Sequence, residues 1–137
     1  MNATTVAVST LQDTIRRAVE RFPCEWPRIA RAAALVALGH VEQLGPDVFT
    51  VRSQTDVGVT YTVQAGTYAE RATGCACRDA QRNPGQSCKH AWSVDLIQVA
   101  EERQRRLDAA AHEQEKRSRV SADAVALAYG RRIGWAA

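Results

Sequence analysis

Two stretches near the N-terminus carry apolar residues at the spacing of amphipathic helices. In the first stretch they recur at intervals of three or four, at Leu11, Ile15, Ala18 and Phe22. Either Ser9 or Thr10 can cap this helix. After a break that begins at Pro23, a second helix is predicted over residues 27–38, where Gly39 can end it. The chain is therefore expected to begin with a pair of helices.

The next stretch alternates apolar and polar residues, as half-buried strands do. We predict a short strand over residues 40–44, a second over 48–54 and a third over 59–64, the last two forming a hairpin. The alternation is clearest in the third strand, with Val59, Tyr61 and Val63 on one face. Residues 67–74 are expected to pair beside this hairpin and to lead into the cysteines that follow.

The last third of the chain has the pattern of a long helix. Residues 89–119 contain no Gly or Pro, and the first half of this run is amphipathic, with Trp92, Leu96 and Val99 along one line. Beyond Leu107 the apolar stripe thins, so the distal half is expected to project into solvent or against another subunit. Ser121 can cap a short final helix that runs through Tyr129.

Length and composition indicate a single globular protein. The chain has 137 residues, of which 45% are hydrophobic and 24% charged, and no apolar run approaches the roughly 20 residues of a membrane span. Residues 1–9 carry no positive side chain ahead of their short apolar patch, so we expect no signal peptide. We therefore expect a cytoplasmic protein in a reducing compartment, with no membrane partner.

Charge is unevenly distributed along the chain. The net charge is +3, but residues 41–70 carry four acidic side chains against one basic, whereas residues 71–90 carry four basic against one acidic. The basic excess therefore coincides with the part of the chain that contains most of the cysteines. It is smaller than the excess typical of a strongly basic nucleic-acid-binding domain.

Three of the four cysteines and one of the three histidines fall in one short segment, at Cys75, Cys77, Cys88 and His90. Thiolates and imidazole are the ligands of closed tetrahedral zinc sites, and three Cys with one His fill all four positions. In an extended segment, Cys75 and Cys77 can point at the same ion. Because residues two apart on a helix diverge, Cys88 should precede a helix that has His90 in its first turn. Amide groups at that helix start favour the Cys88 thiolate.

The pattern Cys-x-Cys, a loop, then Cys-x-His resembles the SWIM zinc-finger family, in which Cys88-Lys89-His90 matches a common form of the second ligand pair. The resemblance extends upstream to the hairpin over residues 48–64 and downstream to the helix from Ala91, covering about residues 32–105. It implies a structural Zn²⁺ and binding of nucleic acid or protein rather than catalysis. The segment from Ala65 to Gly74 is longer and less strand-like than the family's approach to its first cysteine.

Together these patterns predict a small α+β fold with two N-terminal helices, a three-stranded antiparallel sheet, a Cys3His zinc finger and a long C-terminal helix. We divide the chain into a helical pair over 1–39, a SWIM-like zinc-finger core over 40–107, and a helical extension and tail over 108–137. Zinc is expected to stabilise the finger and the junction of sheet and helix rather than the whole chain.

Two functions fit this sequence. The first is a non-enzymatic module that binds nucleic acid, with DNA favoured, as an accessory factor in transposition, recombination or defence. Its phosphate contacts would come from Arg78, Arg82 and Lys89, next to the zinc ligands. The second is a protein-interaction adaptor or inhibitor that uses the long helix and the tail. A protein partner or larger complex is expected in either case, and a small-molecule substrate is not.

The remaining candidate residues point to no further chemistry. Cys24, beside Trp26, is expected to be a small buried hydrophobic residue. His40 and His112 have no carboxylate at a catalytic spacing and are expected at the surface or at element ends. No Ser/His/Asp arrangement, phosphate-binding glycine loop or paired acid motif is visible. We therefore expect the protein not to be an enzyme.

Overall fold

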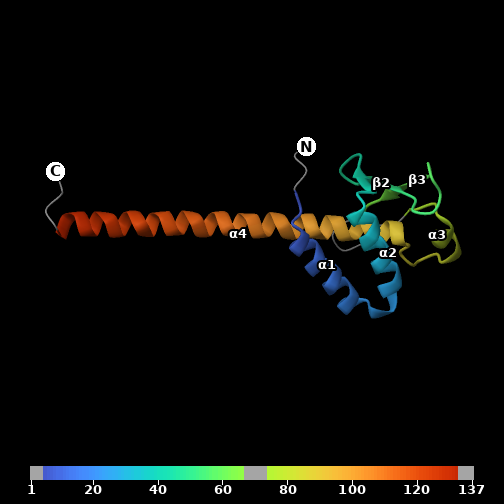
Figure 1. The fold of residues 1–137 in the computed structure, drawn as a ribbon, viewed down its shortest axis with the longest axis horizontal. Coiled ribbons are helices and arrows are strands. Elements are labelled where there is room, and N and C mark those ends of the chain that lie inside the picture. Colours follow the sequence, from blue (N-terminus) through green and yellow to red (C-terminus); the bar gives the residue numbers. More distant parts are fainter. Residues whose placement is uncertain (1–4, 67–73, 133–137) are drawn as a thin grey trace.

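The structure is a computed structural model that describes residues 5–66 and 74–132. The elements follow in the order α1 (Val8–Arg21), the 3-10 helix η1 (Pro23–Glu25), α2 (Trp26–Ala37), β1 (Val41–Gln43), β2 (Val48–Arg52), β3 (Thr60–Gln64), α3 (Arg78–Arg82) and α4 (Lys89–Arg132). Figure 1 shows α1, α2 and the sheet gathered around the first part of α4, while the rest of α4 extends away as a single rod. The predicted α+β fold is confirmed.

The three strands form one antiparallel sheet in the order β1-β2-β3. Val51 in the central strand pairs with Val41 on one side and with Tyr61 on the other. Phe49 and Val51 are buried, whereas Thr50 between them is only partly buried, so one face of the sheet covers the core. The alternating pattern of the sequence thus corresponds to a sheet that is buried on one side.

The predicted strands are present but shorter than the pattern suggested. The hairpin expected over 48–54 and 59–64 is formed by β2 and β3. The strand expected over 67–74 falls almost entirely on residues 67–73, which lie outside the described residues, and Gly74 is not in a strand. The chain therefore enters the cysteine segment in irregular backbone.

Two groups of buried side chains hold the fold together, one on each side of the first turns of α4. The first joins the sheet to α2 and α4 and contains Leu35, Phe49, Val51, Val63, Ala65, Cys77, Cys88, Ala91 and Val94. The second joins α2 to α4, with Ile29, Ala32, Trp92 and Leu96 at its centre and residues of α1 packed against it. Trp92 also meets the ring of Phe22 edge-on, with centroids 5.4 Å apart. The start of α4 is therefore covered by the sheet and by the helical pair.

Helix α1 is attached to α4 by polar contacts that replace its predicted cap. The helix begins at Val8, and Ala7 in the cap position offers no side-chain hydrogen bond. The hydroxyl of Thr10 instead donates to Oε1 of Gln104 at 2.7 Å, and the Ala7 N–H donates to the same oxygen at 3.2 Å. The expectation that Ser9 or Thr10 caps the helix is wrong, because the Thr10 hydroxyl is used in this tertiary contact.

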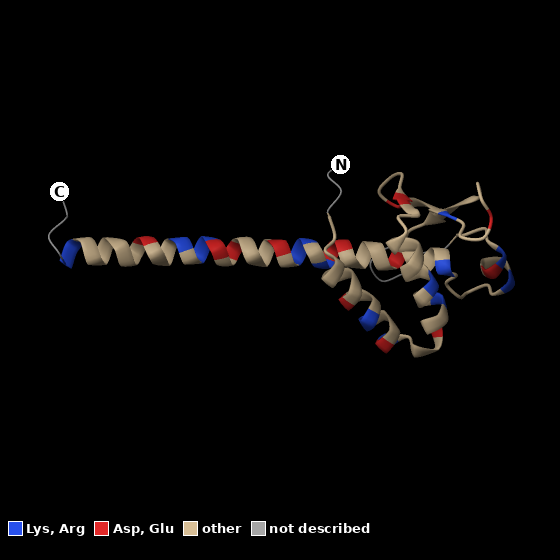
Figure 2. Cartoon of the chain, viewed as in Figure 1, with Lys and Arg blue, Asp and Glu red and all other residues tan. Residues whose placement is uncertain are grey.

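Helix α4 is a single helix of 44 residues. The predicted break at Ser121 is wrong, because this Ala-rich segment contains no proline that would interrupt the helix. Ion pairs one turn apart, such as Glu115 with Arg119 at 2.7 Å, support the exposed part. Figure 2 shows charges of both signs interspersed along it. Even so, no helix in the described ranges combines the length and apolar character needed to cross a membrane.

Cys24 lies at the surface, which corrects the expectation that it is buried. It belongs to the 3-10 turn η1, which connects α1 to α2. The neighbouring Phe22 supplies the side chain that packs inward against Trp92, so the turn needs no further apolar contact. His112 is also exposed, on the distal half of α4, as expected for a lone surface histidine.

Candidate metal centre

The first two ligand candidates lie in the irregular segment that leads into α3. Cys75 is half-buried and Cys77 is buried, while Ala76 between them is exposed. Cys77 has extended backbone angles and occupies the N-cap of α3, where its sulfur accepts a hydrogen bond from the Ala80 N–H at 3.4 Å. The expectation that the two thiols share a face holds without a strand, because extended backbone suffices to place alternate residues on one side.

The second pair lies at the start of α4. Cys88 immediately precedes the helix, and its sulfur accepts a hydrogen bond from the Ala91 N–H at 3.4 Å. His90 is the second residue of the helix, so the prediction that Cys88 precedes a helix with His90 in its first turn is confirmed. At a helix start the backbone N–H groups are free to donate, which places a partial positive charge next to the Cys88 sulfur.

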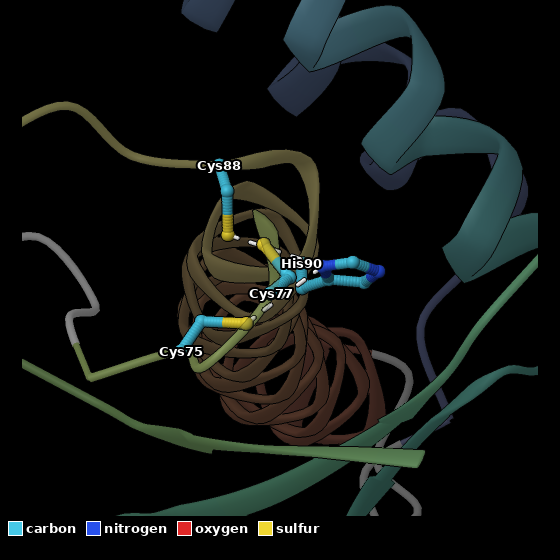
Figure 3. A group of neighbouring side chains, drawn as sticks. All are labelled: Cys75, Cys77, Cys88 and His90. Atoms are coloured by element: carbon cyan, nitrogen blue, oxygen red, sulfur yellow. Dashed lines mark hydrogen bonds between the residues drawn. The ribbon is translucent and has the colours of Figure 1, made fainter. Parts of the chain in front are cut away.

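The structure brings all four side chains together. One ligand atom from each of Cys75, Cys77, Cys88 and His90 lies within 4.8 Å of the other three. Nδ1 of His90 is 3.7 Å from the Cys75 sulfur and 3.9 Å from the Cys88 sulfur. A tetrahedral ion with metal–sulfur bonds of about 2.3 Å and a metal–nitrogen bond of about 2.0 Å places nitrogen and sulfur about 3.5 Å apart, so these two separations are close to those of one shared ion. Figure 3 shows the three sulfurs directed toward each other and toward the imidazole.

Most of this Cys3His group is buried. Cys77, Cys88 and His90 are only 5%, 2% and 3% exposed. The imidazole also lies against the ring of Tyr61, with centroids 4.6 Å apart, which fixes its orientation from the sheet side. Its other nitrogen, Nε2, is buried and has no hydrogen-bond partner within the described ranges. Nδ1 is therefore the nitrogen that faces the thiols and could ligate a metal ion.

Without a bound cation, the three thiols differ in pKa. A hydrogen bond from Cys75, with further ones involving His90 and the Ala91 N–H, lowers the pKa of Cys88 to about 4 despite its burial. Cys75 has a raised pKa because it donates to Cys88 and is partly buried. Burial likewise raises the pKa of Cys77. A cation bound to all three sulfurs would therefore release the protons of Cys75 and Cys77.

No protein-family model matches this chain, and no curated protein or solved structure matches it either. The likeness to SWIM zinc fingers stays a hypothesis that rests on ligand spacing and element order. What the structure supplies independently is the donor set: four Cys and His side chains, three of them buried and Cys75 half-buried, that converge and could hold a metal ion.

The segment between the two ligand pairs contains a helix that the sequence analysis missed. This helix, α3, has only one turn and is bounded by Cys77 and Asn83. Asn83 donates to the carboxylate of Asp79 at 2.8 Å and so ties the end of the helix back to its first turn. Asp79 and Asn83 could have been recognised as a cap-like pair at i and i+4, but the turn-rich residues after Asn83 obscured the signal.

Helix α2 holds α3 in place through Arg28. The Arg28 guanidinium donates to both carboxylate oxygens of Asp79, at 3.0 and 3.1 Å, and to Oε1 of Gln86 at 2.7 Å. A further bond reaches Glu25 at 3.3 Å. Nothing in the local sequence marks Arg28 for this role, because its acceptor Asp79 lies 51 residues away and only folding brings the two together.

The three basic residues predicted to contact phosphate lie beside the metal group. Arg78 and Arg82 are exposed and one turn apart on α3, and Lys89 is partly buried at the first position of α4. His40, the remaining histidine, is not part of the group. It lies in a cavity of about 390 Å³ at the outer face of the sheet, beside Glu42 and Arg52.

Proposed function

We propose that the protein is a non-enzymatic, SWIM-type zinc-finger module. The observation that carries this proposal is the convergence of four Cys and His side chains in a largely buried group. Thiolate-rich tetrahedral sites select Zn²⁺, and a site with four protein ligands leaves no open position for a catalytic water. The ion would be held by Cys75, Cys77, Cys88 and Nδ1 of His90. Its effect would be to fix the cysteine segment and α3 against the start of α4.

We further propose that the module binds nucleic acid, with DNA favoured, through the basic residues around this centre. Ion pairs neutralise many arginines elsewhere: Arg16 and Arg17 pair with Asp13, and Arg117 and Arg119 pair with glutamates one turn away. Arg78, Arg82 and Lys89 form no ion pair with any described residue. Because their charges are not compensated locally, they are free to contact phosphates.

Titration of labelled duplex and single-stranded DNA across a salt series tests this function. Binding should weaken steeply with salt, and Arg78→Ala or Arg82→Ala should each reduce the slope of log K against log salt by about 0.9, because each removes one phosphate contact. Arg117→Ala, which removes an exposed arginine that is paired with Glu113, is the matched control and should leave the slope unchanged. Absence of binding even at low salt would reject the function.

A specific feature of α4 favours a second function, protein interaction through the distal helix. A line of uncharged residues runs along it at alternating intervals of four and three, at Leu107, Ala111, Gln114, Ser118, Ser121, Val125 and Ala128. The same line passes through Ala100, which is fully buried, and Gln104, which contacts α1. In the distal half these positions are exposed, with Val125 at 66%. This spacing is that of a helix-pairing seam.

The occupant that best fits this seam is a second copy of the chain in antiparallel orientation. The two ends of the seam are apolar and its centre is polar. When two copies pair in antiparallel orientation, Leu107 and Ala111 of one helix therefore lie opposite Val125 and Ala128 of the other, and the polar centres of the two seams meet. Because α4 extends from one end of the globular part (Figure 1), the antiparallel arrangement also keeps the two globular bodies at opposite ends of the paired helices. An adaptor of this kind would need no nucleic-acid contact.

Light scattering coupled to gel filtration tests the pairing. The chain should elute as a dimer of twice its 15.0 kDa mass, and truncation after Leu107 should yield a monomer. Val125→Glu should also give a monomer, because it buries a charge in the seam. Ala126→Glu introduces the same side chain one position away, off the seam, and should stay dimeric. A wild-type chain that remains monomeric at high concentration would contradict self-pairing.

A further inference from the structure

Helix α2 carries a second arginine near the zinc loop. Arg31 lies one turn beyond Arg28 in α2, so the two side chains project from the same side of the helix. Arg28 binds Asp79, Gln86 and Glu25, and its side chain is only 23% exposed. Arg31 is exposed and has no ion-pair partner in the described part of the chain. The docking of α3 by Arg28 therefore leaves Arg31 free beside it.

The ion pair of Arg28 with Asp79, at 3.0 Å, holds α3 against the side of α2 on which Arg31 also lies. Asp79 is the sole acidic residue between 71 and 90, and Arg28 neutralises it. Figure 2 shows the basic residues of α2, α3 and the start of α4 on the same end of the molecule.

We propose that Arg31 is a fourth phosphate-contacting residue, so that Arg31, Arg78, Arg82 and Lys89 form one composite basic surface across α2, α3 and the start of α4. This inference rests on the proposed nucleic-acid function. Its partner is the phosphodiester backbone of a nucleic acid. The helical pair is then part of the binding site rather than only a support for the finger.

The chemistry of the four side chains favours phosphate. Three of them are arginines, whose planar guanidinium donates two parallel hydrogen bonds to phosphate oxygens, and at least three are exposed enough to reach a ligand. The four side chains present their charge on three separate elements. A surface of this kind binds a backbone with little sequence preference.

Anisotropy of a labelled duplex and of a labelled single strand tests the inference. Arg31→Ala should weaken binding about fivefold at low salt and lower the salt slope by about one, the same change that we expect for Arg82→Ala. Arg17→Ala is the matched control, since Arg17 is exposed on α1 and paired with Asp13, and it should bind as wild type. Arg31 is a surface residue, so an unchanged melting temperature should show that the variant is folded.

The outcomes separate the inference from the function on which it rests. If wild type binds neither probe, both fail. If Arg78→Ala and Arg82→Ala weaken binding but Arg31→Ala does not, the composite surface is wrong and the nucleic-acid function stands. Competition with polyglutamate tests whether the surface is specific for phosphodiester. If polyglutamate displaces DNA at equal charge concentration, the surface binds acidic ligands in general, and the assignment to phosphodiester is overturned. Comparing the affinities for the two probes shows whether the phosphodiester backbone is bound in duplex or in single-stranded form.

Discussion

Replacing Cys77 by Ser is expected to abolish stoichiometric zinc binding and to lower the melting temperature by about 10 °C or more. The expected loss in unfolding free energy is about 4 kcal/mol, the size of change that removal of a metal site produces. Serine keeps the approximate volume but does not supply a thiolate, so the loss of bound zinc reports on ligation. Zinc analysis of protein purified without chelators and a thermal melt by circular dichroism measure both quantities.

The expected effect of Cys77→Ser is large because Cys77 has three roles. It is 5% exposed in the main core, its sulfur accepts the Ala80 N–H at the cap of α3, and it is one of four converging ligands. With the metal lost, the two remaining thiols and His90 would stay buried without the cation that compensates them. Metal binding to such a site is coupled to folding, so the free energy of ligation is lost from stability.

Cys24→Ser is the matched control for this experiment. Cys24 is exposed in η1 and has no part in the Cys3His group, so the same substitution there should leave zinc content and melting temperature unchanged. A Cys77→Ser protein that still holds one zinc ion per chain, or melts with wild type, would overturn the metal centre. Equal losses from Cys24→Ser would point instead to a general effect of thiol removal.

Leu35→Ala is expected to destabilise the metal-loaded protein by about 2–5 kcal/mol, as large-to-small substitutions in buried cores do. Leu35 belongs to α2 but is fully buried in the same core as Phe49 and Val63 of the sheet and Cys77 and Cys88 of the metal group. Its truncation should therefore loosen the support of the metal group from the helical side. Thermal melting and the rate of zinc loss to a chelator should both show it.

Leu38→Ala provides the comparison within the same part of the chain. Leu38 is 60% exposed immediately after α2, so its truncation should change stability by no more than about 0.5 kcal/mol. If Leu35→Ala lowers the melting temperature but leaves zinc loss to the chelator as slow as in wild type, the helical pair is not coupled to the metal group. A single cooperative transition in wild type would show that the helices and the finger unfold together.

The features that could be predicted from sequence are those set by residues close together in the chain. The Cys-x-Cys and Cys-x-His spacings indicate the backbone conformation that each pair of ligands needs. Because residues two apart on a helix diverge, Cys88 was expected just before a helix, where it lies. The alternation of residues 59–64 likewise anticipated β3, because one face of the sheet is buried. These local rules operate whatever the rest of the chain does.

The features that were missed depend on contacts between distant residues. The Arg28–Asp79 pair joins positions 51 apart, and nothing around either residue distinguishes it from a solvated charge. Thr10 looked like a helix cap, but its hydroxyl bonds to Gln104, 94 positions away. Ser121 is a different case: it looked like a helix start, but ion pairs one turn apart in the preceding residues and the absence of proline let α4 continue through it. For Arg28 and Thr10, the deciding partner lies far away in the sequence.

The uninterrupted length of α4 gives the molecule a rigid spacer. At a rise of about 1.5 Å per residue, its 44 residues span about 66 Å, and only the first part is covered by the rest of the protein. Any cargo attached near Arg132 would be kept at a nearly fixed separation from the opposite end of the molecule. The length of α4 would thereby set the distance between that cargo and a partner bound at the opposite end of the molecule.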